Sequence, residues 1–144
     1  MAIFGAGSNW GKVEKKDDFF IDHKFEIGWD YDSAPDLYYL ASSIKVGDII
    51  YLKANQVGSR KIRVKGIGII TEGFLHRFME PRCIERCSTN PYLKIKWVIR
   101  DEFYIIIPES EGRLTNVRAA TFYEEFLPYV QKAIIEKFLS QTIG

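Results

Sequence analysis

The chain has 144 residues, of which 47% are hydrophobic and 15% are aromatic, and its formal net charge is +1. This hydrophobic content is sufficient for a core and excludes a disordered chain, and the length predicts one domain that spans residues 1–144. The sequence has no run typical of a membrane span and no signal-peptide pattern. With only two cysteines, we expect a cytoplasmic protein that has no membrane partner.

The charge is unevenly distributed along the chain. Residues 1–44 contain 4 basic and 8 acidic side chains, residues 45–100 contain 12 basic and 4 acidic, and residues 101–144 contain 4 basic and 7 acidic. A central segment with an excess of 8 positive charges predicts an electropositive surface, and phosphate is its commonest partner. The alternative is an ordinary solvated sheet face whose lysines meet counter-charges from other segments.

The first third of the chain predicts short elements. An apolar run at residues 2–4 leads into a Gly-rich turn at residues 5–11, which lacks the Gly-Lys-Ser/Thr ending of a phosphate loop. We expect a short strand at residues 19–21. The segment of residues 25–31 is expected to end a second strand at Gly28–Trp29. A helix is expected over residues 35–43, because proline and aspartate suit a first helical turn.

The central segment predicts a hairpin, with strands at residues 48–54 and 61–71 joined by a polar loop. Lys61, Arg63 and Lys65 alternate with apolar residues and glycine in the second strand. The pattern therefore predicts one charged face and one packed face.

The remaining chain begins with a long irregular segment, residues 72–91, of a length that is often functional. Strands follow at residues 92–100, where Lys94 and Lys96 take the polar face, and at residues 103–107. Thr121 and Glu124 resemble a capping box, and a terminal helix is expected over residues 128–140. Strands mixed with two or three helices predict an α+β domain with a mostly antiparallel, barrel-like sheet.

Enzymatic chemistry is not indicated by the sequence. It has no recognisable nucleophile and base arrangement, no cluster of metal ligands and no phosphate loop. Cys83 and Cys87 lack the second ligand pair that a zinc site needs. We therefore expect a protein that is not an enzyme and that uses no metal and no cofactor.

Four segments carry a family resemblance: KVGDIIYLKA, IRVKGIGIIT, YLKIKWVIRDE and LTNVRAATFYEEFLPYVQKAIIEKFL. In this order they resemble the PUA-like superfamily, and within it the EVE and YTH domains, over residues 25–139. The resemblance implies a β-barrel flanked by helices, with a surface pocket that holds a modified base in an aromatic cage. It also implies modified DNA or RNA as the partner.

The resemblance assigns roles to several residues. Trp29 matches the first wall of the cage, Phe74 and Phe78 stand in the loop of the second wall, and Trp10 is a possible substitute wall. Asn116 and Arg118 match a Thr-Asn-x-Arg segment that meets a base edge or a phosphate. Independently of the resemblance, Asp30 is placed to accept a hydrogen from a base, although capping of the next helix is an alternative for the aspartates of this loop. The candidates for phosphate contacts are Lys61, Arg63, Lys65, Arg77, Lys94, Lys96 and Arg118.

Three functions remain open from the sequence. The first is a reader of a modified, methylated base in nucleic acid, where aromatic stacking contributes about 1–3 kcal/mol per base and a basic rim holds phosphates. An effector or nuclease protein is an additional possible partner. The second is a sensor of a free nucleotide or a small ring-bearing metabolite. The third is a protein-interaction domain that has the fold without the pocket, in which Trp29 is buried.

Overall fold

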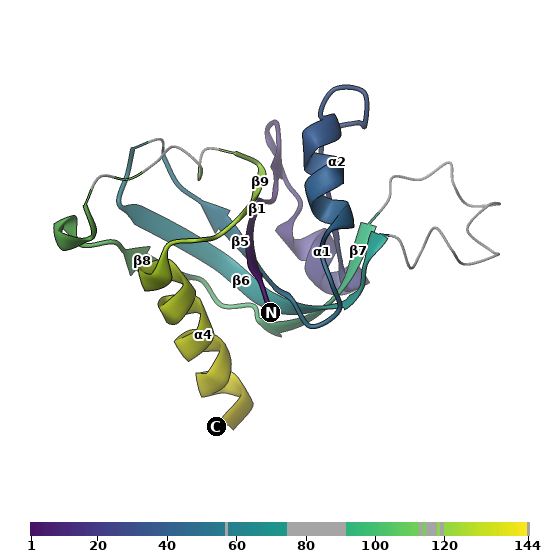
Figure 1. Cartoon of the computed structure of the whole chain (residues 1–144). Coiled ribbons are helices and arrows are strands. Elements are labelled where there is room, and N and C mark those ends of the chain that lie inside the picture. Colours follow the sequence, from purple (N-terminus) through teal and green to yellow (C-terminus); the bar gives the residue numbers. More distant parts are fainter. Residues whose placement is uncertain (57, 75–91, 113, 115–117, 119, 144) are drawn as a thin grey trace.

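The computed structural model describes residues 1–56, 58–74, 92–112, 114, 118 and 120–143. Its main feature is a seven-stranded sheet with the order β4-β7-β6-β5-β1-β9, in which β8 pairs with β6 beside β7 (Figure 1). These strands are β1 (Ile3–Gly7), β4 (Lys24–Glu26), β5 (Ile49–Ala54), β6 (Lys61–Glu72), β7 (Tyr92–Ile99), β8 (Phe103–Ile106) and β9 (Phe122–Glu124).

The sheet is mostly antiparallel and curls into a half-barrel (Figure 1). Among the described strands, β1 and β5 are the one parallel pair. A two-stranded ribbon precedes the first helix, and a short 3-10 turn follows β8. These smaller elements and the helices are β2 (Asn9–Trp10), β3 (Val13–Glu14), α1 (Lys16–Asp22), α2 (Pro35–Ser42), η2 (Glu109–Glu111) and α4 (Pro128–Ile143). The expected α+β class with a curled, mostly antiparallel sheet is therefore confirmed.

Side chains of the sheet enter two hydrophobic clusters, one on each face. On β5, Ile50 and Leu52 belong to the cluster that includes α1 and α2, whereas Ile49 and Tyr51 belong to the cluster that includes α4. This alternation follows from the period of two in a β-strand. No helix within the described ranges is long and apolar enough to cross a membrane.

Several expected elements match the structure and others do not. The strands β5 to β8 and the helices α2 and α4 lie within a few residues of their expected bounds. Residues 19–21 were expected to be a strand, but they lie in helix α1, where Phe19 contacts Trp10 and Phe20 contacts Trp97. The prediction of a capping box at Thr121 and Glu124 is wrong, because Phe122–Glu124 is a strand paired with β1. The Gly-rich turn was expected to begin at Gly5, but Gly5 and Gly7 lie in strand β1.

The expected alternation of charge on β6 fails at Lys65. The register passes from Leu52 opposite Gly66 to Lys53 opposite Val64, so Lys65 is the extra residue of a β-bulge. Lys61 is exposed as expected, but the Lys65 side chain is buried, with 1% exposure. A β-bulge changes the direction of a side chain without a change in the residue pattern, so the pattern did not indicate that Lys65 is buried.

Candidate ligand-binding site around Trp29

Trp29 lies in the turn between β4 and α2, and its side chain is half exposed, at 54%. Its indole Nε1 donates to Thr121 Oγ1 at 3.3 Å, and its backbone oxygen accepts a hydrogen bond from the Tyr38 hydroxyl at 2.6 Å. The two contacts join the turn to β9 on one side and to α2 on the other. An exposed tryptophan with a fixed orientation offers a flat surface on which a ring can stack.

Two exposed tyrosines extend the aromatic surface of this corner. Tyr31 and Tyr39 are 50% and 67% exposed, and their hydroxyl oxygens are 3.2 Å apart. The Tyr31 ring packs edge-on against Tyr38 at 5.7 Å. Sequence reasoning did not include these tyrosines, although the spacing of Trp29 and Tyr31 in one turn was a usable signal.

Trp10 lies behind the turn, against Gly28. A Cβ atom at Gly28 would come within 2.7 Å of the Trp10 indole, so only glycine permits this close approach. The other contacts of Trp10 are the Phe19 ring at 6.1 Å and the Lys15 ammonium at 4.8 Å. Its Nε1 is buried and has no hydrogen-bond partner within the described part of the chain. Trp10 therefore supports the turn that presents Trp29.

Asp30 is exposed and stabilises the same turn. Its Oδ1 accepts a hydrogen bond from the Ser33 backbone N–H at 3.0 Å, and its backbone oxygen accepts one from Ala34. The hydrogen bonds from Ser33 lower the pKa of the Asp30 carboxyl. An ionised carboxylate beside Trp29 can accept a further hydrogen bond from a ligand N–H group.

Lys53 on β5, which the sequence reasoning missed, holds the chain directly before Thr121. The Lys53 ammonium donates to the backbone oxygens of Arg118 and Ala120 and to Asn55 Oδ1 at 3.1 Å. Ala120 directly precedes Thr121, the acceptor of the Trp29 indole N–H. Burial, with the nearby positive charges of Arg118 and Lys65, lowers the pKa of the Lys53 ammonium to about 8.

Arg118 lies in a buried network instead of at a surface. It forms two hydrogen bonds to the Glu125 carboxylate, at 2.9 and 2.7 Å, and is 6% exposed. Glu125 also accepts a hydrogen bond from the Tyr51 hydroxyl, which is 2.8 Å from the Tyr123 hydroxyl. Burial raises the pKa of both tyrosines. The expected contact of Arg118 with a phosphate would require this pair to open.

The other expected phosphate-binding residues are spread over the sheet. Lys65 is paired with Glu14 at 2.6 Å, Arg63 with Glu102 at 3.1 Å, and Lys94 is 3.9 Å from Glu72. Lys61 lies over the Tyr104 ring, and Lys96 is exposed. The structure thus does not bring these cations together into one rim. For Arg63 and Lys65 the counter-charges come from outside the basic segment, as the alternative interpretation of its charge expects.

The remaining candidates divide between the core and the part of the chain outside the description. Phe74 is 4% exposed and packs near Tyr38 in the cluster beside α2. Phe74 therefore packs in the core and is not exposed, as a wall of a surface cage would be. Arg77, Phe78, Cys83, Cys87 and Asn116 lie outside the described residues. Within the described ranges, no group of three or more His, Cys, Asp or Glu side chains is placed to hold a metal ion.

In comparisons with known proteins, no family model matches the chain, and no curated protein matches it.

Proposed function

We propose that this domain is a PUA-like reader that binds a methylated base of DNA or RNA by stacking it on Trp29. The observation that carries the proposal is the half-exposed indole of Trp29, held between Thr121 and Tyr38. An exposed indole that is already held in place loses little conformational freedom when a ring stacks on it. Tyr31, in the same turn, and Tyr39, on α2, are further exposed aromatic side chains.

The chemistry of the corner suits the edge of a base as well as its face. The ionised Asp30 carboxylate can accept a hydrogen bond from an exocyclic N–H group. An exocyclic nitrogen that carries one methyl group keeps one N–H, and its methyl group can contact aromatic rings. A base that has been flipped out of a strand would therefore meet both an acceptor and an apolar surface, which repays part of the unstacking cost.

The test is a titration of fluorescent single-stranded DNA and RNA oligonucleotides, methylated and unmethylated, at two salt concentrations. We expect tighter binding of a methylated strand. We also expect Trp29→Ala to weaken it by about 5- to 150-fold, which corresponds to about 1–3 kcal/mol of stacking. The matched control is Tyr104→Ala, because Tyr104 is 54% exposed like Trp29 but lies on β8. Absence of binding at low salt, or equal affinity of the Trp29→Ala protein, contradicts the proposal.

A free nucleotide or small ring-bearing metabolite is the second candidate, and the placement of the cations favours it. Lys65 and Arg63 already have carboxylate partners, and a short ligand needs no extended basic rim. In this case one nucleotide would raise the melting temperature while oligonucleotides would not. The protein-interaction alternative expected Trp29 to be buried, whereas its exposed fraction is 54%.

A further inference from the structure

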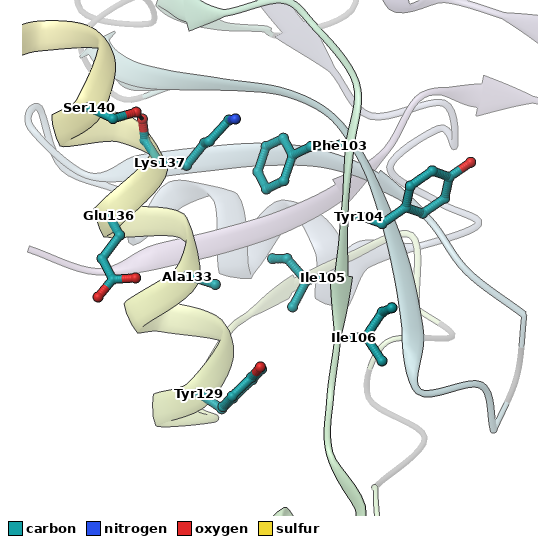
Figure 2. Close-up of a pocket in the computed structure, with 9 residues that line it drawn as sticks. All are labelled: Phe103, Tyr104, Ile105, Ile106, Tyr129, Ala133, Glu136, Lys137 and Ser140. Atoms are coloured by element: carbon teal, nitrogen blue, oxygen red, sulfur yellow. Dashed lines mark hydrogen bonds between the residues drawn. The ribbon is translucent and has the colours of Figure 1, made fainter. Parts of the chain in front are cut away.

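A groove of about 410 Å³ lies between strand β8 and helix α4, among residues distinct from the Trp29 site. Figure 2 shows Phe103 and Ile105 pointing from β8 toward the helix, and Tyr104 pointing away from it. The helix side of the groove is formed by Tyr129, Ala133, Glu136, Lys137 and Ser140. A strand therefore forms one wall of an open, largely apolar channel, and a helix forms the other.

The backbone of β8 has unused hydrogen-bonding groups along this groove. Within the described part of the chain, β8 pairs with β6 alone, with Ile62 opposite Ile105. Ile107 donates to the Arg60 carbonyl at 2.8 Å in the same register. Because alternate residues of an antiparallel strand bond to the same neighbour, the peptide groups of Phe103 and Ile105 face β6. Those of Tyr104 and Ile106 face the open edge.

The side chains of this edge are unusual for an unpaired strand. Tyr104 and Ile106 are 54% and 64% exposed, and the four residues of β8 include no lysine or proline. Exposed apolar edges pair readily with other strands, and proteins normally block them with charges, proline or bulges. Strand β8 is short, but its four residues carry no charge and no proline that would block pairing.

Two ammonium groups flank the first half of β8, one over each ring. Lys137 lies 5.0 Å from the centre of the Phe103 ring, and Lys61 lies 4.2 Å from the centre of the Tyr104 ring. Neither lysine forms a salt bridge within the described ranges, whereas Glu136 is 3.8 Å from Lys132. These two ammonium groups would attract carboxylates on a strand that pairs with β8.

We propose that this edge binds an extended, acidic segment of a partner protein, which adds as a strand to β8. Its alternate apolar side chains would pack into the groove against α4, as in other cases of strand addition. The four residues of β8 extend over about 13 Å, at about 3.3 Å per residue, so the site accommodates four or five residues. A second copy of the chain is disfavoured, because pairing β8 with itself would bring four lysines of the same charge together.

The experiment selects displayed random nonapeptides on the immobilised full chain. We expect enrichment of sequences with apolar residues at alternate positions and an excess of aspartate and glutamate. A selected peptide, made synthetically, should bind the wild type and lose at least tenfold in affinity for Ile106→Pro. That substitution removes an outward N–H and leaves the bonds to β6 in place. Ile106→Thr keeps the N–H and should change affinity by less than threefold.

The charge is tested by Lys137→Glu, for which we expect at least a fivefold loss. Its control is Lys12→Glu, an exposed lysine in the turn between β2 and β3 that does not line the groove. Amide exchange on the wild-type protein gives a readout that needs no variant. The bound peptide should slow the exchange of the Tyr104 and Ile106 amides and leave those of Phe103 and Ile105 unchanged. Enriched peptides without alternation, equal binding to the Ile106→Pro protein, or no slowing of these two amides would overturn the proposal. A concentration-dependent dimer that Ile106→Pro abolishes would overturn it in favour of a second copy.

Discussion

Lys53 and Lys65 are both buried lysines on neighbouring strands, but their ammonium groups are stabilised in different ways. Lys65 meets a carboxylate, that of Glu14, at 2.6 Å and the Ser8 hydroxyl at 3.0 Å. Lys53 meets two backbone oxygens and an amide oxygen, and its pKa is lowered to about 8. A carboxylate partner neutralises a buried charge, whereas carbonyl groups only solvate it. The charge of Lys53 therefore depends on pH, and its partner Ala120 directly precedes Thr121, the acceptor of the Trp29 indole N–H.

The largest expected effect comes from removal of the buried Glu125 carboxylate. Glu125→Leu leaves the buried Arg118 guanidinium and the Tyr51 hydroxyl without their acceptor. We expect the free energy of unfolding to fall by about 3–5 kcal/mol, as when one partner of a buried pair is removed. Urea unfolding measures it. The control, Glu124→Gln at the neighbouring position, should stay within about 0.5 kcal/mol, and an equal loss in both would contradict the role of Glu125.

A smaller loss is expected at the carboxylate-paired lysine. Glu14→Gln leaves the Lys65 ammonium with weaker partners, and we expect a loss of about 1–3 kcal/mol in unfolding free energy, because Glu14 is partly exposed and water can reach the site. Adding Lys65→Met should restore at least half of that loss, since it removes the buried charge itself. A double variant as unstable as the single one would show that the pair is not the reason for the loss.

The carbonyl-solvated lysine predicts an unusual pH dependence. Because the pKa of Lys53 is lower in the folded state than in the unfolded state, the unfolded chain binds more protons above pH 8, and stability rises with pH there. The expected gain between pH 8 and 9.5 is about 1–2 kcal/mol. Above about pH 10 the raised pKa values of Tyr51 and Tyr123 act in the opposite direction. Lys53→Met should abolish the rise, and a wild type without it would contradict the assignment.

The sequence predicted those helices and strands that depend on residues close together in the chain. The Gly-Asp turn before β5, the alternation of residues in β6 and β7, and the proline starts of α2 and α4 identified these elements from the sequence. Helix α1 was missed because Phe19 and Phe20 are adjacent and apolar, as in a short strand. The better signal was the acidic pair Asp17 and Asp18, which suits the first turn of a helix.

The charged residues were harder to place, because their partners are remote in sequence. Nothing near Lys65 indicates a bulge or its pairing with Glu14, 51 residues away. Likewise, Lys53 meets oxygens more than 60 residues away. Of the candidate site, the sequence named Trp29 and Asp30, which the structure places in one exposed turn, and their contact with a ligand stays a prediction. It could not predict Thr121 as the acceptor of the Trp29 indole N–H, because that contact depends on the pairing of β9 with β1.

The smallest expected effect concerns the link from Lys53 to Trp29. Thr121→Val removes the acceptor of the Trp29 indole N–H and should change the unfolding free energy by about 0.5 kcal/mol or less, because the bond is exposed. The substitution should have a larger effect on the motion of the Trp29 side chain than on stability. We expect the ¹⁵N order parameter of the Trp29 indole to fall in Thr121→Val and, to a smaller extent, in Lys53→Met, which loosens the turn at Ala120. Glu14→Gln should leave it unchanged.

Trp97 provides the internal reference for that measurement, because its indole N–H donates to the Phe19 carbonyl at 2.9 Å within the core. Its order parameter should stay constant in all three variants. If Lys53→Met leaves Trp29 as rigid as in the wild type, the two buried lysines differ only in their stabilising partners, and the charge of Lys53 has no influence on the ligand site. If Trp29 loosens, ligand affinity should weaken above pH 8 as Lys53 loses its proton, because a neutral amine holds the Ala120 carbonyl less strongly.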